Sequence, residues 1–141
     1  MILLCHRSLA ALGLILLAAV VVSCGTSDPN SNRILISIAV TPPTADAQNF
    51  SNGQVVFTAN GTFSLQPSPA PVPSTTPYSS QFTVSNSATN QVIATIVNSG
   101  SGTATVQCVS GMSGTVTVGA TASANNGLAT TVSGIAQITC P

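Results

Sequence analysis

The chain beyond residue 33 alternates apolar residues with threonine, serine and asparagine. In "GTVTVGATA" (114–122), valine and alanine occupy one side of an extended chain and threonine the other. Because successive side chains of a strand point to opposite faces, this period of two predicts strands that are buried on one face. The same pattern, enriched in β-branched residues and bounded by Gly, Asn and Pro, predicts seven strands: 34–40, 53–65, 81–84, 92–97, 103–109, 114–122 and 129–140.

These strands predict one all-β domain over residues 34–141. Seven short strands and no helical period favour a β-sandwich over a barrel. In the first strand, "ILISIAV", the alternation predicts that Ile34, Ile36, Ile38 and Val40 face the core. The "NNG" at 125–127 predicts a hairpin turn between the last two strands.

A proline-rich segment, "QPSPAPVPSTTPY" (66–78), interrupts the alternation. Its five prolines cannot join a central strand and favour polyproline II. We interpret it as a stiff loop between the second and third strands. An exposed recognition arm, or a site for O-linked sugar, is the functional alternative, and deletion of 67–77 followed by a partner-binding assay would separate them.

Near the N-terminus, an apolar run ends at a cysteine. His6 and Arg7 precede about 14 uncharged residues, fewer than the roughly 20 that span a bilayer as a helix. This predicts a signal peptide over 1–23 rather than a retained transmembrane anchor. "VVSC" resembles the lipobox of bacterial lipoproteins, which implies diacylglycerol on the Cys24 sulfur, cleavage before it and acylation of the new amino group. An ordinary signal peptide that ends near a buried cysteine is the alternative.

Residues 24–33, "CGTSDPNSNR", are small, polar and turn-rich, and predict a flexible tether between lipid and domain. Several acyl chains on Cys24 would hold the protein on a membrane. The membrane is therefore one expected partner. The residue after the cysteine is Gly25, whereas Asp there retains many proteobacterial lipoproteins at the inner membrane. The sequence therefore favours an envelope location at the outer membrane and leaves open which face the domain occupies.

Charge almost disappears once the signal peptide is removed. The remaining charged side chains are Asp28, Arg33 and Asp46. The lack of a basic patch argues against nucleic-acid binding, which depends on phosphate neutralisation. No His, Lys or Glu remains to act as a base, and two aspartates cannot form a metal cage alone. We therefore expect no catalytic, cofactor or metal site and no enzymatic activity.

Four cysteines divide into three roles. Cys5 leaves with the signal peptide and Cys24 takes the lipid, so Cys108 and Cys140 remain as an even pair in an exported chain. Both lie on the apolar phase of their strands. This predicts a Cys108–Cys140 disulfide in or beside the core.

Several segments resemble bacterial immunoglobulin-like domains of group 2. They are "SIAVTPPTADAQNFSNGQVVFTANGTF", "VSNSATNQVIATI", "SGTATV" and "GTVTVGATA", and together they span most of 34–139. The resemblance implies an Ig-like sandwich of the kind used in surface proteins and adhesins, with no catalytic residues to transfer. Such domains often carry Trp on the third strand, where this chain has Phe82.

The sequence thus predicts a lipid-anchored envelope lipoprotein with one Ig-like domain and a non-catalytic role in adhesion, interaction or structure. The alternative is a periplasm-facing accessory subunit of an envelope complex. An envelope or surface protein is the expected partner, and the sequence leaves the oligomeric state open. Because the chain lacks the lysines that often protect sheet edges, the first strand or the last is a candidate to accept a partner strand.

Overall fold

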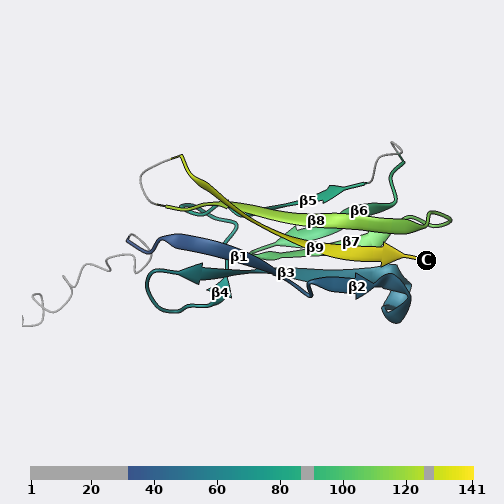
Figure 1. Ribbon diagram of the computed structural model, residues 1–141, viewed down its shortest axis with the longest axis horizontal. Helices are drawn as coiled ribbons and strands as arrows, with labels where there is room; N and C mark the ends of the chain where they lie inside the picture. Colours follow the sequence, from purple (N-terminus) through teal and green to yellow (C-terminus); the bar gives the residue numbers. More distant parts are fainter. Residues whose placement is uncertain (1–31, 87–90, 126–128) are drawn as a thin grey trace, which may run out of the picture. The chain divides into compact units, whose positions relative to one another are not determined.

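Two β-sheets make up the part of the chain that the computed structural model describes, residues 32–86, 91–125 and 129–141 (Figure 1). One sheet has the order β1-β3-β7-β6, with a short β4 also beside β3, and the other has the order β2-β9-β8-β5. The strands are β1 (Leu35–Thr41), β2 (Thr44–Asp46), β3 (Gln54–Phe63), β4 (Ala70–Pro71), β5 (Gln81–Ser85), β6 (Ala94–Gly100), β7 (Thr103–Cys108), β8 (Gly114–Ser123) and β9 (Thr131–Cys140). The predicted all-β sandwich is confirmed.

The strand order follows the immunoglobulin constant-type scheme. Strands β1, β3, β7 and β6 occupy the positions of strands A, B, E and D, and β9, β8 and β5 those of G, F and C. The chain leaves the first sheet after Thr41, passes through Pro42 and Pro43, and enters the second as β2, parallel to β9. Strand A is therefore divided between the two sheets.

Alternation places the core as the sequence predicts along most strands. On β8, the valines and alanines at 116, 118, 120 and 122 are buried between the sheets, and the threonines between them face outward. On β7, Ala104 and Val106 are buried in the same way. Apolar side chains from both inner faces form one cluster, which replaces water with close packing.

The first strand departs from the predicted phase. Leu35 is 1% exposed, whereas Ile34 and Ile36, predicted to face the core, are 38% and 59% exposed. The pairing of β1 with β3 shifts register between Leu35 and Ser37, which marks a bulge. The extra residue reverses the inside–outside phase at the start of the strand, so only Ile38 and Val40 of the predicted set are buried.

Strands β1 and β9, from opposite sheets, approach each other closely at Gly134. A Cβ atom built on Gly134 would lie 2.4 Å from the carbonyl oxygen of Ile38. Only glycine lets the two backbones come this near. This contact closes the side of the sandwich on which the chain crosses between sheets.

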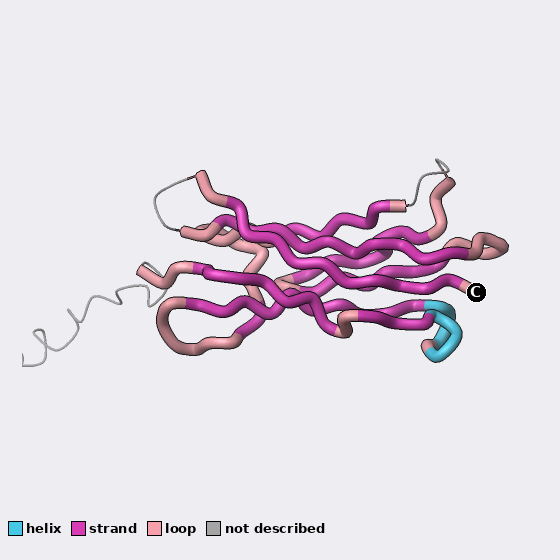
Figure 2. The backbone as a smooth tube through the Cα atoms, in the orientation of Figure 1, coloured by secondary structure: helices cyan, strands magenta, loops and turns pink. Residues whose placement is uncertain are grey.

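Short elements occupy segments without alternation. Two 3-10 turns, Ala47–Asn49 and Ser51–Gly53, follow β2 (Figure 2). The Asp46 carboxylate caps the first by accepting a 3.0 Å hydrogen bond from the backbone N–H of Gln48. The strand predicted at 92–97 runs instead over 94–100. Strands β8 and β9 pair antiparallel, and residues 126 and 127 of their predicted turn lie outside the described residues.

Candidate functional site

The two cysteines predicted to pair form a disulfide. It joins Cys108, the last residue of β7, to Cys140, the last residue of β9, with their Cα atoms 5.7 Å apart. Because these strands belong to different sheets, the bond ties the sheets together at one end of the sandwich. In the chain-entropy treatment, a loop of 32 residues gives about 3–4 kcal/mol of stabilisation.

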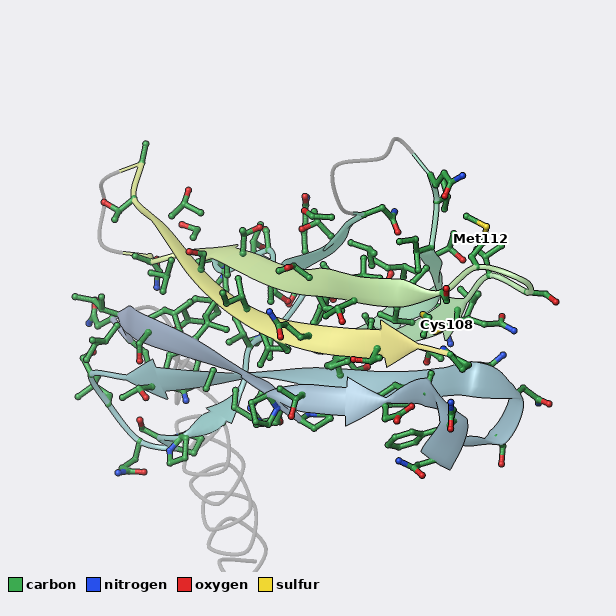
Figure 3. All side chains as sticks on the ribbon, turned by 45° about the vertical axis from the view of Figure 1, so that its right-hand side comes forward. Cys108 and Met112 are labelled. Carbon is green, nitrogen blue, oxygen red and sulfur yellow. A yellow bond between two sulfur atoms is a disulfide. The ribbon has the colours of Figure 1, made fainter. Side chains whose placement is uncertain are left out.

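The turn between β7 and β8 lies at the same end. The turn carries Met112, labelled in Figure 3, whose partly buried side chain packs against the core cluster. The backbone N–H of Met112 donates to the carbonyl of Val109 over 3.1 Å. A hollow of about 370 Å³ beside Cys108 is lined largely by this turn and by Pro141. The lining contains no charged side chain.

Cys24, predicted to carry the lipid, lies outside the described residues, as do the signal peptide 1–23 and most of the predicted tether. The last tether residue, Arg33, belongs to the folded domain and is only 4% exposed. Within the described ranges, no helix is long and apolar enough to cross a membrane.

Arg33 is held by backbone carbonyls and an aromatic ring. Its Nε donates to the Leu65 carbonyl over 3.0 Å, and its Nη2 donates to the Pro67 carbonyl. The guanidinium carbon lies 3.5 Å from the centre of the Phe63 ring, in cation–π geometry. These contacts satisfy a charge for which the structure describes no acidic partner nearby.

The single tyrosine completes this cluster. The Tyr78 hydroxyl donates a 2.7 Å hydrogen bond to the Arg33 carbonyl, and its ring meets the Phe63 ring edge-on with 5.3 Å between centroids. Asn125 also donates to the Arg33 carbonyl, over 3.1 Å. Sequence alternation missed this cluster because Arg33 and Tyr78 lie outside the alternating segments. The sequence did contain one signal for this cluster, because the chain has a single tyrosine and a single basic residue after the predicted cleavage site.

The proline-rich segment is bound to the sandwich rather than extended as an arm. Ala70 and Pro71 pair with β3, and the Val72 N–H donates to the Ala59 carbonyl over 2.8 Å. The side chains of Val72 and Tyr78 are fully buried. Val72 and Tyr78 are therefore part of the core. The exposed surface of the segment combines the hydroxyls of Ser74, Thr75 and Thr76 with proline rings.

Two charged side chains occur in the described residues, Arg33 and Asp46, and each is engaged by the contacts given above. Within those residues, no group of three or more His, Cys, Asp or Glu could hold a metal ion. The surface is therefore one of hydroxyls, amides and scattered apolar groups. Contacts to such a surface would depend on hydrogen bonds and shape rather than on charge.

The sheet edges offer the most direct means of association. Strands β1 and β6 end one sheet, and β2 and β5 end the other. The last strand, β9, was predicted as an open edge, but β2 pairs with its residues 137–139 and covers it there. The first strand, β1, is a true edge, although its bulge disrupts the regular row of hydrogen-bonding groups.

A hollow of about 410 Å³ lies beside β5 and β6, which are edge strands of the two different sheets. It is lined by β5 residues Gln81 and Phe82, by β6 residues Ser99 and Gly100, and by Ser74 and Ser80 of the preceding loop. Phe82, the residue at the expected Trp position, is half-buried against the core.

No protein-family model matches this chain, and no curated protein or solved structure shows significant similarity to it.

Proposed function

We propose that this chain is a lipid-anchored lipoprotein of the bacterial cell envelope whose Ig-like sandwich has a non-catalytic role in adhesion, interaction or structure. In this proposal Cys24 carries the lipid, the domain belongs with the bacterial Ig-like domains of group 2, and the outer membrane is the site. The partner is an envelope or surface protein.

The Cys108–Cys140 disulfide is the observation that carries the proposal. Disulfides persist in oxidising compartments outside the bacterial cytoplasm, so a disulfide that joins two sheets supports an exported domain. The export-type N-terminus with "VVSC" supports the same compartment. The immunoglobulin-type strand order supports the family assignment.

The first test is the intact mass of the protein extracted from its own membrane, measured with and without reductant. We expect the mass of Cys24–Pro141 plus acyl chains, and a gain of two hydrogens on reduction. A chain without acyl chains would contradict the anchor. An unchanged mass on reduction would contradict the disulfide.

A second test separates surface exposure from a periplasm-facing accessory role. Arg33 is the one Lys or Arg after the predicted cleavage site and is buried, so trypsin and amine-labelling reagents are unsuitable probes. Proteinase K applied to intact cells is suitable because it needs no basic residue. Digestion of the domain on intact cells supports the surface role, whereas digestion only after the outer membrane is opened supports the periplasmic alternative.

A further inference from the structure

The four terminal strands of the two sheets differ in how their edges are protected. Both β1 and β6 contain a register shift, between Leu35 and Ser37 and between Ile96 and Asn98. Strand β2 has three residues, includes Asp46 and follows two prolines. Bulges, short length, charge and proline all discourage the pairing of an edge with another chain.

Strand β5 has none of these devices except modest length. It pairs with β8 residue for residue, from Gln81 opposite Thr121 to Ser85 opposite Thr117, without a register shift. Its five residues, "QFTVS", contain neither proline nor charge. In the described part of the chain, no strand and no loop backbone bonds to its outer edge.

The core beneath β5 is incompletely covered. Phe82 and Val84 face the core but remain half-exposed, whereas their β8 neighbours Ala120 and Val118 are fully buried. The 410 Å³ hollow lies beside Phe82 and leaves room for a side chain from an added strand. Another strand at this edge would cover both apolar side chains.

The sequence of β5 is complementary to itself. An antiparallel pair centred on Thr83 places Phe82 opposite Val84 of a second copy, and Gln81 opposite Ser85. Aromatic–β-branched pairs and hydroxyl pairs across strands are favourable, and there is no charge to repel. A slip of one residue would place Phe82 opposite a polar side chain, and a slip of two would place Val84 opposite Ser80 or Phe82 opposite Asn86. Only the pairing about Thr83 therefore matches both apolar residues with apolar partners.

We propose that β5 is the docking edge for a second copy of this chain, with the two β5 strands paired antiparallel about Thr83. The two four-stranded sheets then form one continuous sheet across the dimer. Because the two-fold axis reverses the strand direction, the strands of the two copies run in opposite directions. Two copies anchored to one membrane would therefore lie with their strands along its surface.

The interface is small, because stable interfaces bury about 1,200 Å² or more and two five-residue strands offer less. We therefore expect weak pairing in dilute solution and stronger pairing where copies are confined. Confinement on a membrane raises the effective concentration, and this part of the proposal rests on the proposed lipid anchor.

Cysteine crosslinking in the full-length protein, in its native membrane, tests the geometry. Directly opposite residues of an antiparallel pair have Cα atoms about 4.5–5.5 Å apart, which suits a disulfide. Under mild oxidation we expect most of the Thr83→Cys chain to migrate as a dimer on a non-reducing gel. A mixture of Gln81→Cys and Ser85→Cys chains should also crosslink, each chain to the other.

Two matched controls exclude random collision. Ser133→Cys is exposed on the outer face of the same sheet but two strands away, and Ser37→Cys lies on the bulged edge β1. Both should give several-fold less dimer than Thr83→Cys. Equal crosslinking of Ser37→Cys or Ser133→Cys would overturn the proposal.

A charge variant gives an independent test. Thr83→Lys places two ammonium groups opposite each other, and in the Gln81→Cys plus Ser85→Cys mixture it should remove the crosslink. The same lysine at Ser133 should leave it unchanged. An unaltered melting temperature for both lysine variants would show that the sandwich is intact.

The outcomes separate this proposal from the proposed function. A protein without acyl chains that still forms the Thr83→Cys dimer would contradict the lipid anchor but support pairing through β5. A properly acylated, folded Thr83→Cys protein that stays monomeric, or that crosslinks to a different protein, would overturn the second copy as the occupant of β5.

Discussion

The phenol of Tyr78 donates a 2.7 Å hydrogen bond to the backbone carbonyl of Arg33. These residues are 45 positions apart, and the bond joins the end of the proline-rich segment to the chain just before β1. Both residues are buried. The start of the domain is thus fixed by side-chain contacts as well as by the β1–β3 pairing.

Removal of this hydroxyl should have a measurable but limited effect. We expect Tyr78→Phe to lower the free energy of unfolding by about 1 kcal/mol, because Asn125 still donates to the same carbonyl. Urea denaturation measures the change. Thr117→Val, on the outer face of β8, should stay within about 0.5 kcal/mol of the parent, and an equal loss in both variants would contradict the role of the bond.

Arg33 should contribute more to the free energy of unfolding than a residue of a flexible tether would. Arg33→Ala leaves the Leu65 and Pro67 carbonyls without their charged donor and removes the contact with Phe63, so we expect a loss of about 2–4 kcal/mol. Arg33→Lys keeps the charge without the planar fork and should fall between parent and alanine variant. Urea midpoints of the three proteins decide this. If Arg33→Ala were as stable as the parent, the Arg33 side chain would contribute nothing to the stability of the domain.

The proline-rich segment should contribute to stability through Val72. Val72→Ala removes two buried methyl groups, and we expect a loss of about 2 kcal/mol in the free energy of unfolding. Ser74→Ala, on the exposed part of the same segment, should be nearly neutral. Deletion of 67–77 removes Val72 as well, so a loss of binding in that variant would report unfolding. Point substitutions at Ser74, Thr75 and Thr76 are the appropriate test for a binding role.

The contact at Gly134 should not tolerate a side chain. In Gly134→Ala the new Cβ would meet the Ile38 carbonyl at 2.4 Å, so β1 and β9 must separate, at a cost of about 2–3 kcal/mol. Gly100→Ala is the matched control, since its nearest neighbour would be the Thr103 hydroxyl at an ordinary 3.6 Å. Thermal unfolding of both variants is the measurement. A Gly134→Ala melting temperature at or above that of Gly100→Ala would contradict the close approach.

Most of the strands could be predicted from alternation alone. Strands β3, β7, β8 and β9 have one buried face, and their side chains follow a period of two. The phase at the start of β1 was wrong because a bulge adds a residue that no local pattern reveals. The short β2 and β4 were missed because pairing with a longer neighbour, rather than their own composition, makes them strands.

The candidate site was only partly predictable. The disulfide could be predicted because Cys108 and Cys140 share the apolar phase and no other pair remained. The Arg33–Tyr78 bond could not, since it depends on how two segments 45 positions apart in the sequence meet. The choice of β5 as the open edge likewise required the strand order, which identifies the strands with a neighbour on one side only.

The disulfide also determines how the molecule behaves when its chain is cut. Residues 109–113, the turn between β7 and β8, lie between the two bonded cysteines. A single cut in this turn leaves both fragments covalently linked, so the nicked and intact chains run together on a gel until reductant separates them. Protection of the domain from a protease on intact cells must therefore be read after reduction, where a nicked chain yields two pieces.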